Sequence, residues 1–370
     1  MLKRILKLGV IGGGLNSSIG KAHFSALAMD GLFEISSGFF SRDKKTNERT
    51  IKSLSLNPNK NFPNLDSYLE SKEINSVDAF LILSPTHMHY EHLEKIINLK
   101  KSIICEKPCC ADLKEFKYIK KLVEKNKINF FITYNYLGYP IFLDIKKMLI
   151  EKSIGKIHRI DLNMLQQGLS NTKILKVKKW RLVDQKLPTI QLDLGVHLLS
   201  ILFFFFPKIR INKIFCDVSK IKKLNLVHSL DAFIKLENDI FCKYSISKYR
   251  VGKRNELSFQ IFGEKGSLSW THLNPETLIK FDQFGTQQIL DRNDETLKIS
   301  KEKRYNRYTV GHPYGFIESM ANIYQDIYSR LQSNKINQTS SLLSLSDESS
   351  IMETSTLLKK SYMQNRWIKK

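Results

Sequence analysis

Three polar residues of this sequence stand where they could exchange a proton with a bound molecule. Asp193 and His197 are four residues apart at the start of an apolar run, a spacing that predicts one shared face of a helix. An imidazole has a reference pKa of about 6.5, so beside a carboxylate it can act as an acid or a base near neutral pH. A core histidine with a structural hydrogen bond is the alternative. Lys107, within Glu106-Lys107-Pro108, is a candidate cation or proton carrier that a strand end could position.

A glycine-rich turn follows the first strand-like run. Gly12 and Gly14 match the first two positions of a G-x-G-x-x-G turn, and the third glycine, Gly20, comes about three residues later than usual. Glycines let the backbone approach a pyrophosphate, which then lies at a helix N-terminus. The turn therefore predicts dinucleotide binding, and an ordinary tight turn between a strand and a helix is the alternative.

The end of the second expected strand carries polar residues that bear on the choice of dinucleotide. An acidic residue there would hold the ribose hydroxyl of NAD, whereas an arginine accommodates the 2′-phosphate of NADP. Ser41 and Arg42 favour NADP, while Asp43, two residues late, leaves NAD open. A solvated loop charge is the alternative for Arg42.

Three histidines, His87, His89 and His92, follow Ser84-Pro85-Thr86. Their close spacing raises a zinc site, but zinc needs further ligands and usually a carboxylate behind them. The Pro-Thr pair is typical of a helix start, which would put His89 and His92 on one helix face. We therefore expect a loop over a cofactor at a strand end, and no metal.

These motifs need a framework, and the hydrophobic pattern predicts one. Strand-like and helix-like runs alternate through residues 1–133, which predicts an α/β Rossmann domain with a doubly wound parallel sheet. The expected strands are Ile5–Ile11, Phe33–Phe40, Val77–Leu83, Ser102–Cys105 and Asn129–Thr133. The expected helices are Gly20–Ala28, Asn47–Leu54, His87–Leu99 and Leu113–Asn126.

The pattern changes after about residue 134. Residues 134–370 are expected to form a second, α+β domain around an open, mostly antiparallel sheet. Its expected strands are Lys156–Leu165, Arg210–Ser219, Leu230–Leu236, Phe241–Ser247, Glu256–Phe262 and Ser267–Thr271. Its expected helices are Ile141–Glu151, Asp193–Phe206, Gly311–Leu331 and Leu342–Tyr362, with an exposed loop at Ser333–Ser341.

Composition excludes several classes of protein. With 370 residues, 42% hydrophobic and 26% charged, the chain is neither disordered nor a disulfide miniprotein. The net charge of +23 is spread without a basic run, so we expect a lysine-rich solvated surface and no specific nucleic-acid partner; attraction to an anionic partner is the alternative. The longest apolar run, Val196–Phe206, has 11 residues and is too short to span a membrane. With no secretory signal and five irregularly spaced cysteines, a cytoplasmic location is expected.

Together, these motifs resemble those of the Gfo/Idh/MocA family, the glucose–fructose oxidoreductase and inositol dehydrogenase family. The resemblance covers essentially the whole chain and is carried, in order, by Gly20-x-x-His23, Ser84-Pro85-Thr86-x-x-His89, Glu106-Lys107-Pro108 and Asp193-x-Gly195-x-His197. It implies a Rossmann domain and a substrate domain whose open sheet often mediates dimer or tetramer contacts. One departure is Pro188–Leu192, where members often have glycines, so the substrate shape is expected to differ.

The resemblance also implies an activity. The expected enzyme is an NAD(P)-dependent oxidoreductase that moves a hydride between the nicotinamide and a secondary alcohol or ketone of a sugar, cyclitol or nucleotide-sugar. Lys107, Asp193 and His197 would surround the reacting hydroxyl, with Lys107 or His197 as proton acceptor. The expected cofactor side comprises Gly12, Gly14, Gly20, Ser41, Arg42, Ser84, Thr86, His89, Glu106 and Lys107, and the expected substrate side Tyr136, Trp180, Arg181 and His312. An NAD-dependent glycosidase with transient redox chemistry and a non-catalytic dinucleotide-binding protein are the alternatives.

Overall fold

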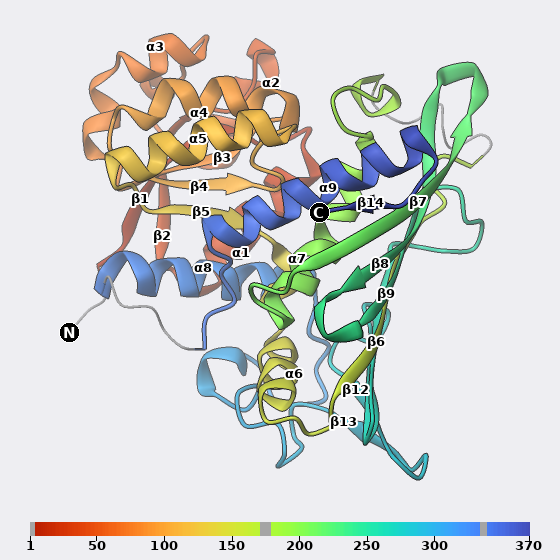
Figure 1. The fold of residues 1–370 in the computed structure, drawn as a ribbon. Helices are drawn as coiled ribbons and strands as arrows, with labels where there is room; N and C mark the ends of the chain where they lie inside the picture. Colours follow the sequence, from red (N-terminus) through yellow and green to blue (C-terminus); the bar gives the residue numbers. More distant parts are fainter. Residues whose placement is uncertain (1–3, 171–178, 334–338) are drawn as a thin grey trace. The chain divides into compact units, whose positions relative to one another are not determined.

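The computed structural model describes residues 4–170, 179–333 and 339–370. The chain forms two compact units: Met1–Gly138 with Gly315–Leu345, and Tyr139–Tyr314 with Ser346–Lys370 (Figure 1). The division expected from sequence, 1–133 and 134–370, differs mainly in the segment that follows residue 314. That segment joins the first unit because its helix α8 (Phe316–Ser333) packs along α1 (Ser18–Asp30).

The first unit is built on a parallel sheet with the strand order β2-β1-β3-β4-β5, as a doubly wound fold requires. Its order reverses between β1 and β3, and open α/β sheets bind ligands at the carboxyl ends of the strands beside such a reversal. An isolated parallel bridge between Gly38 and Asn61 extends the edge beyond β2. The strands are β1 (Leu6–Gly12), β2 (Phe33–Phe39), β3 (Ala79–Leu83), β4 (Ser102–Glu106) and β5 (Phe130–Thr133).

Helices cover both faces of this sheet. Helices α4 and α5 lie on one face, and α1 and α8 lie on the other (Figure 1). Every residue of Ala79–Leu83 is buried, because the central strand is covered on both sides. The helices outside the α1–α8 pair are α2 (Lys44–Ser53), α3 (Leu65–Leu69), α4 (His89–Ile97) and α5 (Leu113–Asn126).

Side-chain caps fix where four of these helices begin, among them Asn64 at the start of α3. The Ser17 hydroxyl accepts a hydrogen bond from the backbone N–H of Gly20 at the start of α1. Asp43 and Asp112 do the same for α2 and α5, accepting from the backbone of the third residue that follows each of them. Each cap satisfies a backbone donor that the helix itself leaves without a partner.

The second unit contains a nine-stranded sheet with the order β13-β12-β11-β10-β6-β9-β8-β7-β14. All its neighbours are antiparallel except β6 and β9, which are parallel, so the expected mostly antiparallel sheet is confirmed. The strands are β6 (Ile157–Leu165), β7 (Ile211–Ile221), β8 (Leu226–Leu236), β9 (Phe241–Ser247), β10 (Glu256–Gly263), β11 (Gly266–Thr271), β12 (Leu278–Asp282), β13 (Gln287–Leu290) and β14 (Ile368–Lys369).

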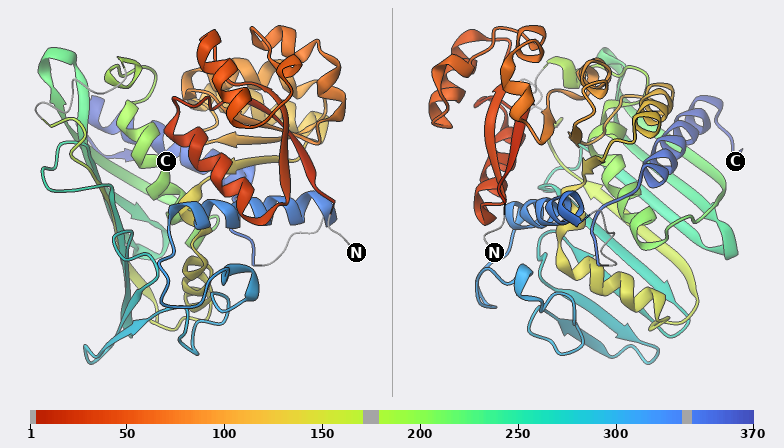
Figure 2. Two further views of the ribbon diagram at one scale, coloured as in Figure 1. Left: turned by 180° about the vertical axis from the view of Figure 1, so that it is seen from behind. Right: turned by 90° about the vertical axis from the view of Figure 1, so that its left-hand side faces the viewer.

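The helices of the second unit, α6 (Pro140–Ile150), α7 (Val196–Phe205) and α9 (Leu345–Gln364), lie on one face of that sheet (Figure 2). All ten residues of α7 are buried, which confirms the apolar run as a core helix. Aromatic rings join α6 to the sheet, with the Phe142 ring 4.7 Å from Trp270 and 5.4 Å from Phe259. Among the described residues, no helix is long and apolar enough to cross a membrane.

Candidate active site

The carboxyl ends of the first sheet's strands bring the sequence motifs of this unit to one edge. In the strand register, Gly12 lies opposite Leu83, and Glu106 lies opposite Thr133. The glycine turn, the Ser84 segment and Lys107 each follow one of these strand ends. This edge is therefore the place where the fold can hold a ligand.

The glycine turn is shaped for close packing against the Ser84 segment and against its own helix. Gly12 and Gly13 have φ values of +88° and +74°, a conformation that L side chains rarely adopt. A Cβ on Gly12 would lie 2.5 Å from the backbone nitrogen of Ser84, and one on Gly20 would lie 2.1 Å from the Gly13 oxygen. Gly20 thus allows α1 to pack against the turn, although it comes three residues later than the usual third glycine. The turn and the N-terminus of α1 together fit a pyrophosphate.

The end of β2 is held by the first turns of α2. The backbone N–H groups of Phe40 and Ser41 both donate to the side-chain oxygen of Asn47, at 2.9 and 3.2 Å. Asp43 caps α2 by accepting a hydrogen bond from the Thr46 backbone at 2.8 Å, and its bonds to Thr46 lower the pKa of Asp43. Asp43 is therefore used as a helix cap, while the side chain of Arg42 is exposed beside it.

Two histidines tie the loop after β3 to the segment after β4. The ring nitrogens of His89 lie 2.7 Å from the carbonyl oxygen of Ser84 and 2.8 Å from that of Pro108. His92 Nδ1 lies 2.9 Å from the Ser84 hydroxyl. Burial lowers the pKa of both histidines, that of His92 to about 4, so the His92 ring is neutral near pH 7. Thr86 opens the short 3-10 turn η3 (Thr86–Met88), which lies between Ser84 and His89.

The described part of the chain holds no group of three or more His, Cys, Asp and Glu side chains that could bind a metal ion. The three neighbouring histidines of this loop do not gather into a metal site. His89 and His92 are buried against the loop, and His87 is exposed.

Glu106, at the end of β4, is the centre of a buried polar chain. Its Oε1 accepts a hydrogen bond from the Thr133 hydroxyl at 2.9 Å and lies 3.3 Å from His23 Nε2. The other ring nitrogen of His23 lies 2.6 Å from the hydroxyl of Tyr324 in α8. All four residues are buried, and Lys107, which follows Glu106, is half-buried. Sequence analysis noted His23 in the family pattern but missed Thr133 and Tyr324.

Tyr136 lies in the first unit, in the 3-10 turn η4 (Asn135–Gly138), and is buried. Its ring packs edge-on against Phe316 of α8, with ring centres 6.4 Å apart. Asn322, also in α8, donates a hydrogen bond to the Gly138 carbonyl at 2.8 Å. Helix α8 therefore supports the turn that carries this substrate-side candidate.

In the second unit, Asp193 lies in a π-helical turn, η7 (Gln191–Gly195), and not in the α-helix that its sequence predicts. The α-helical spacing therefore does not describe how Asp193 stands to His197, which is in the first turn of α7 and buried. Gln191, which begins the turn, accepts a hydrogen bond from the Tyr244 hydroxyl at 2.8 Å and donates one to the Ser355 hydroxyl at 2.9 Å. A single π turn inside a helix is frequent at functional sites.

Two cations contact Asp193. Arg181 Nη1 lies 2.7 Å from its Oδ2, and the ammonium of Lys248 makes a short ion pair with the same oxygen. Lys248 is 8% exposed and was missed by sequence analysis. Its signal is periodicity: it takes the next alternate position after the apolar residues Cys242, Tyr244 and Ile246 of β9, on the same face.

The remaining substrate-side candidates also belong to the second unit. His312 is exposed, its Nδ1 lies 3.1 Å from the Thr309 hydroxyl, and its carbonyl accepts a hydrogen bond from the buried Arg292 at 3.3 Å. Trp180 belongs to the short helix η6 (Lys179–Leu182), and its side chain lies outside the described structure. The structure thus brings Arg181 and Asp193 together with Lys248, and leaves His312 on a separate loop.

Comparison with known sequences assigns both parts of the chain to one family. The description "Oxidoreductase family, NAD-binding Rossmann fold" matches residues 6–134, and the C-terminal domain of the same family matches residues 142–269. An uncharacterized oxidoreductase of Bacillus subtilis, YfiI, is 26% identical over 340 residues, which cover 88% of this chain and 85% of that protein. Glucose-6-phosphate 3-dehydrogenase of the same organism is 25% identical over 280 residues, covering 73% and 75%.

Solved structures have the same fold. An inositol dehydrogenase homolog from Azotobacter vinelandii, solved with NADH and myo-inositol, has a TM-score of 0.90 at 20% identity and covers 99% of this chain and 98% of its own. The two family matches extend over most of the chain and agree with the Rossmann sheet and the glycine turn described above. The chain therefore belongs to the Gfo/Idh/MocA family of NAD-binding oxidoreductases.

Proposed function

We propose that this protein is a dehydrogenase that uses NAD or NADP to oxidise a secondary alcohol of a sugar or cyclitol, or to reduce the corresponding ketone. The observation that carries the proposal is the strand edge at which the glycine turn lies opposite the Ser84 segment and Lys107 follows Glu106. The relatives named above for glucose 6-phosphate and inositol support a polyol substrate. A nucleotide-sugar belongs to the same chemical class.

The residues of the first unit fit the cofactor. The turn at Gly12 and Gly13 leaves no room for a Cβ and opens onto the N-terminus of α1, so backbone N–H groups can hold the pyrophosphate. A bound nicotinamide ring supplies the carbon that gives or takes the hydride. In this proposal Glu106, Ser84 and Thr86 contact the nucleotide, while His89 holds the Ser84 segment and the Pro108 segment together.

Either Lys107 or His197 is proposed to accept the proton of the substrate hydroxyl. Orientation of the reacting groups is proposed as the protein's main contribution to the rate, and proton transfer adds to it. Asp193 is proposed to orient the substrate hydroxyl or the catalytic side chains through its charge. Its contacts with Arg181 and Lys248 support a carboxylate that anchors cations on the substrate side.

The nucleotide is proposed to be NADP. Asp43 is the acidic residue closest to the end of β2, and it is engaged as the cap of α2. Ser41 and the exposed Arg42 precede it, and a guanidinium suits a 2′-phosphate better than it suits a ribose hydroxyl. The protein is also proposed to assemble as a dimer or tetramer through the sheet face that its own helices leave uncovered (Figure 2).

Turnover of defined alcohols tests this function. The protein is mixed with NAD or NADP and with myo-inositol, scyllo-inositol, glucose, glucose 6-phosphate or UDP-glucose, and the absorbance of the reduced nucleotide is followed. We expect at least one alcohol to yield reduced nucleotide in proportion to enzyme. Absence of reduced nucleotide with every alcohol, together with release of free sugar from a glycoside, would favour the glycosidase reading.

A further inference from the structure

Helix α8 lies outside both family matches, which cover residues 6–134 and 142–269, yet it supplies one end of the buried chain around Glu106. The chain runs from Tyr324 through His23 to Glu106, with 2.6 Å between the first pair of atoms and 3.3 Å between the second. None of these side chains is more than 9% exposed. In a buried hydrogen-bond network of this kind each donor must be matched with an acceptor, and with Glu106 ionised the direction of both hydrogen bonds follows.

The direction of each hydrogen bond follows from the acceptor at one end. An ionised carboxylate only accepts, so His23 donates from Nε2 to Glu106. His23 Nδ1 then accepts the hydroxyl proton of Tyr324. If both nitrogens of the His23 ring carried protons, the Tyr324 hydroxyl proton would find no acceptor among these three residues. A buried donor without a partner costs its full desolvation energy. Burial and the nearby charge of Glu106 raise the pKa of Tyr324 well above its usual value, which keeps the hydroxyl protonated as the chain requires.

Both protein donors act on the same oxygen of Glu106. The Thr133 hydroxyl and His23 Nε2 both meet Oε1, so together they restrain the carboxylate, and neither of them uses Oε2. A carboxylate held in this way presents its second oxygen in one direction. Preorganised orientation of this kind is what a site needs to hold a ligand hydroxyl or amide.

We propose that Tyr324 and His23 are positioning residues that hold the Glu106 carboxylate in the orientation in which it receives the dinucleotide. The proposal rests on the proposed function, because it takes Glu106 as a cofactor contact. It gives helix α8 a role in the site as well as in packing. Tyr324 must therefore affect nucleotide affinity only through Glu106. The experiment measures whether its effect on the Kd disappears when Glu106 is replaced.

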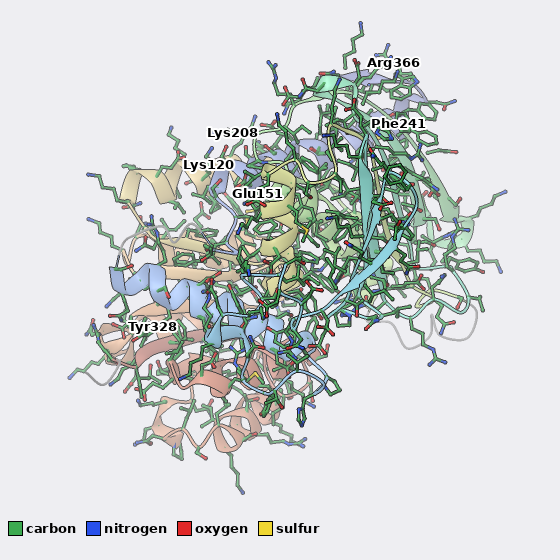
Figure 3. The ribbon with its side chains drawn as sticks, turned by 90° about the horizontal axis from the view of Figure 1, so that it is seen from below. Lys120, Glu151, Lys208, Phe241, Tyr328 and Arg366 are labelled. Atoms are coloured by element: carbon green, nitrogen blue, oxygen red, sulfur yellow. The ribbon has the colours of Figure 1, made fainter. Side chains whose placement is uncertain are left out.

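A neighbouring tyrosine on the same helix provides a matched control. Tyr328, labelled in Figure 3, lies one turn further along α8 and, like Tyr324, packs its ring edge-on against Phe33. Its hydroxyl donates to the Arg4 carbonyl at 2.8 Å, away from the Glu106 chain. Tyr328→Phe therefore removes a comparable hydroxyl and its hydrogen bond without touching Glu106.

The experiment is a double-mutant cycle on nucleotide affinity. The Kd of NADH and of NADPH is measured by fluorescence for the wild type, Tyr324→Phe, Glu106→Gln and the double variant. We expect Tyr324→Phe to raise the Kd of the preferred nucleotide by about tenfold, and to have no further effect in the Glu106→Gln background. Tyr328→Phe should lower the melting temperature as much as Tyr324→Phe does and leave the Kd unchanged.

The outcomes distinguish a failure of the proposed role of Tyr324 from a failure of the proposed function. If the wild type binds neither nucleotide, the proposed function fails. If the wild type binds but Tyr324→Phe matches Tyr328→Phe, or acts equally in both backgrounds, the inference is overturned while the function stands. Should Tyr324→Phe not fold, His23→Leu enters the same cycle, and His23→Gln, which keeps a donor toward Glu106, should restore affinity.

Discussion

The Thr133 hydroxyl donates a hydrogen bond to the Glu106 carboxylate at 2.9 Å, across the pair of residues that ends the β4–β5 register. The bond thereby joins the ends of β4 and β5 at Glu106, the residue before Lys107. The bond links the sheet, which is rigid, to the segment that is proposed to carry the proton. It also explains why a residue without chemistry of its own stands at the carboxyl end of β5.

Lys107→Met is expected to lower turnover at least about a hundredfold, because a positioned proton carrier contributes this much or more to the rate. Nucleotide affinity should fall much less than turnover, since Lys107 is one of ten cofactor-side residues and the pyrophosphate contacts lie in the glycine turn. Reduced-nucleotide absorbance gives the rate, and nucleotide fluorescence gives the Kd. Lys120→Met is the control: this lysine of α5, labelled in Figure 3, forms a 3.8 Å pair with Glu124 on the surface. Full turnover by Lys107→Met would remove Lys107 from the mechanism.

Gly20→Ala is expected to weaken nucleotide binding and to destabilise the fold by about 1–3 kcal/mol, because the new Cβ would meet the Gly13 oxygen. An alanine in a helix normally stabilises by about 1 kcal/mol, so the sign of the change is diagnostic. Chemical denaturation and nucleotide titration measure the two effects. At Gly168 a Cβ would meet nothing within 4 Å, so Gly168→Ala should leave both quantities near the wild type. A stabilised Gly20→Ala protein would contradict the close packing of α1 on the turn.

Arg42→Ala is expected to raise the Kd of NADPH by about tenfold and to leave the Kd of NADH nearly unchanged, because only the former carries a 2′-phosphate. Arg49, exposed on α2, provides the control substitution. Equal affinity losses for the two nucleotides would show that Arg42 does not read the 2′-phosphate.

The stability of the protein should fall as the pH drops from about 6.5 toward 4, in part through His92. Burial lowers the pKa of His92 to about 4 in the folded chain, whereas an unfolded histidine titrates near 6.5. Between these values the unfolded chain binds a proton that the folded chain does not, so the free energy of unfolding decreases with falling pH. The contribution of His92 to the slope of the unfolding free energy against pH is at most about 1.4 kcal/mol per pH unit.

His92→Gln removes this contribution and should flatten the stability profile in that pH range, as measured by denaturation at several pH values. His158→Gln, at an exposed position, should leave the slope unchanged. His89, whose pKa burial also lowers, should preserve part of the slope in His92→Gln. An unaltered profile would mean that His92 is protonated in the folded state at the same pH as in the unfolded chain.

Lys248→Met is expected to destabilise the protein by about 1–3 kcal/mol, because it deprives a partly buried carboxylate of one of its cations. Asp193 keeps its contact with Arg181, which limits the loss. Lys253→Met breaks a 2.8 Å pair with Glu256 that is more exposed, and should cost less than about 1 kcal/mol. Equal effects of the two substitutions would show that Lys248 behaves as a surface lysine.

Local patterns predicted those parts of the fold that are encoded locally. The strand at Ala79–Leu83 is a run of five apolar residues, and the helix Val196–Phe205 is apolar except for His197 and Ser200, so both were found within a few residues of their ends. Strands β12 and β13 were missed because most of their residues are partly or fully exposed and follow no apolar alternation.

Features set by distant contacts were out of reach of such patterns. Gln191, which begins the π turn at Asp193, bonds to Tyr244 and Ser355, which are 53 and 164 residues away. Tyr324 meets His23 across 301 residues, so neither the membership of α8 in the first unit nor the chain around Glu106 has a local signature.

The most direct test of the account is the melting temperature of nucleotide-stripped protein with NAD, NADH, NADP and NADPH added separately at millimolar concentration. A ligand at 100 times its Kd stabilises the folded state by about 2.7 kcal/mol, which is several degrees for a chain of this size. We predict a shift with at least one oxidised and reduced pair, larger for the NADP pair. An unchanged melting temperature with all four nucleotides would contradict the central claim that the glycine turn at Gly12 binds a nicotinamide dinucleotide.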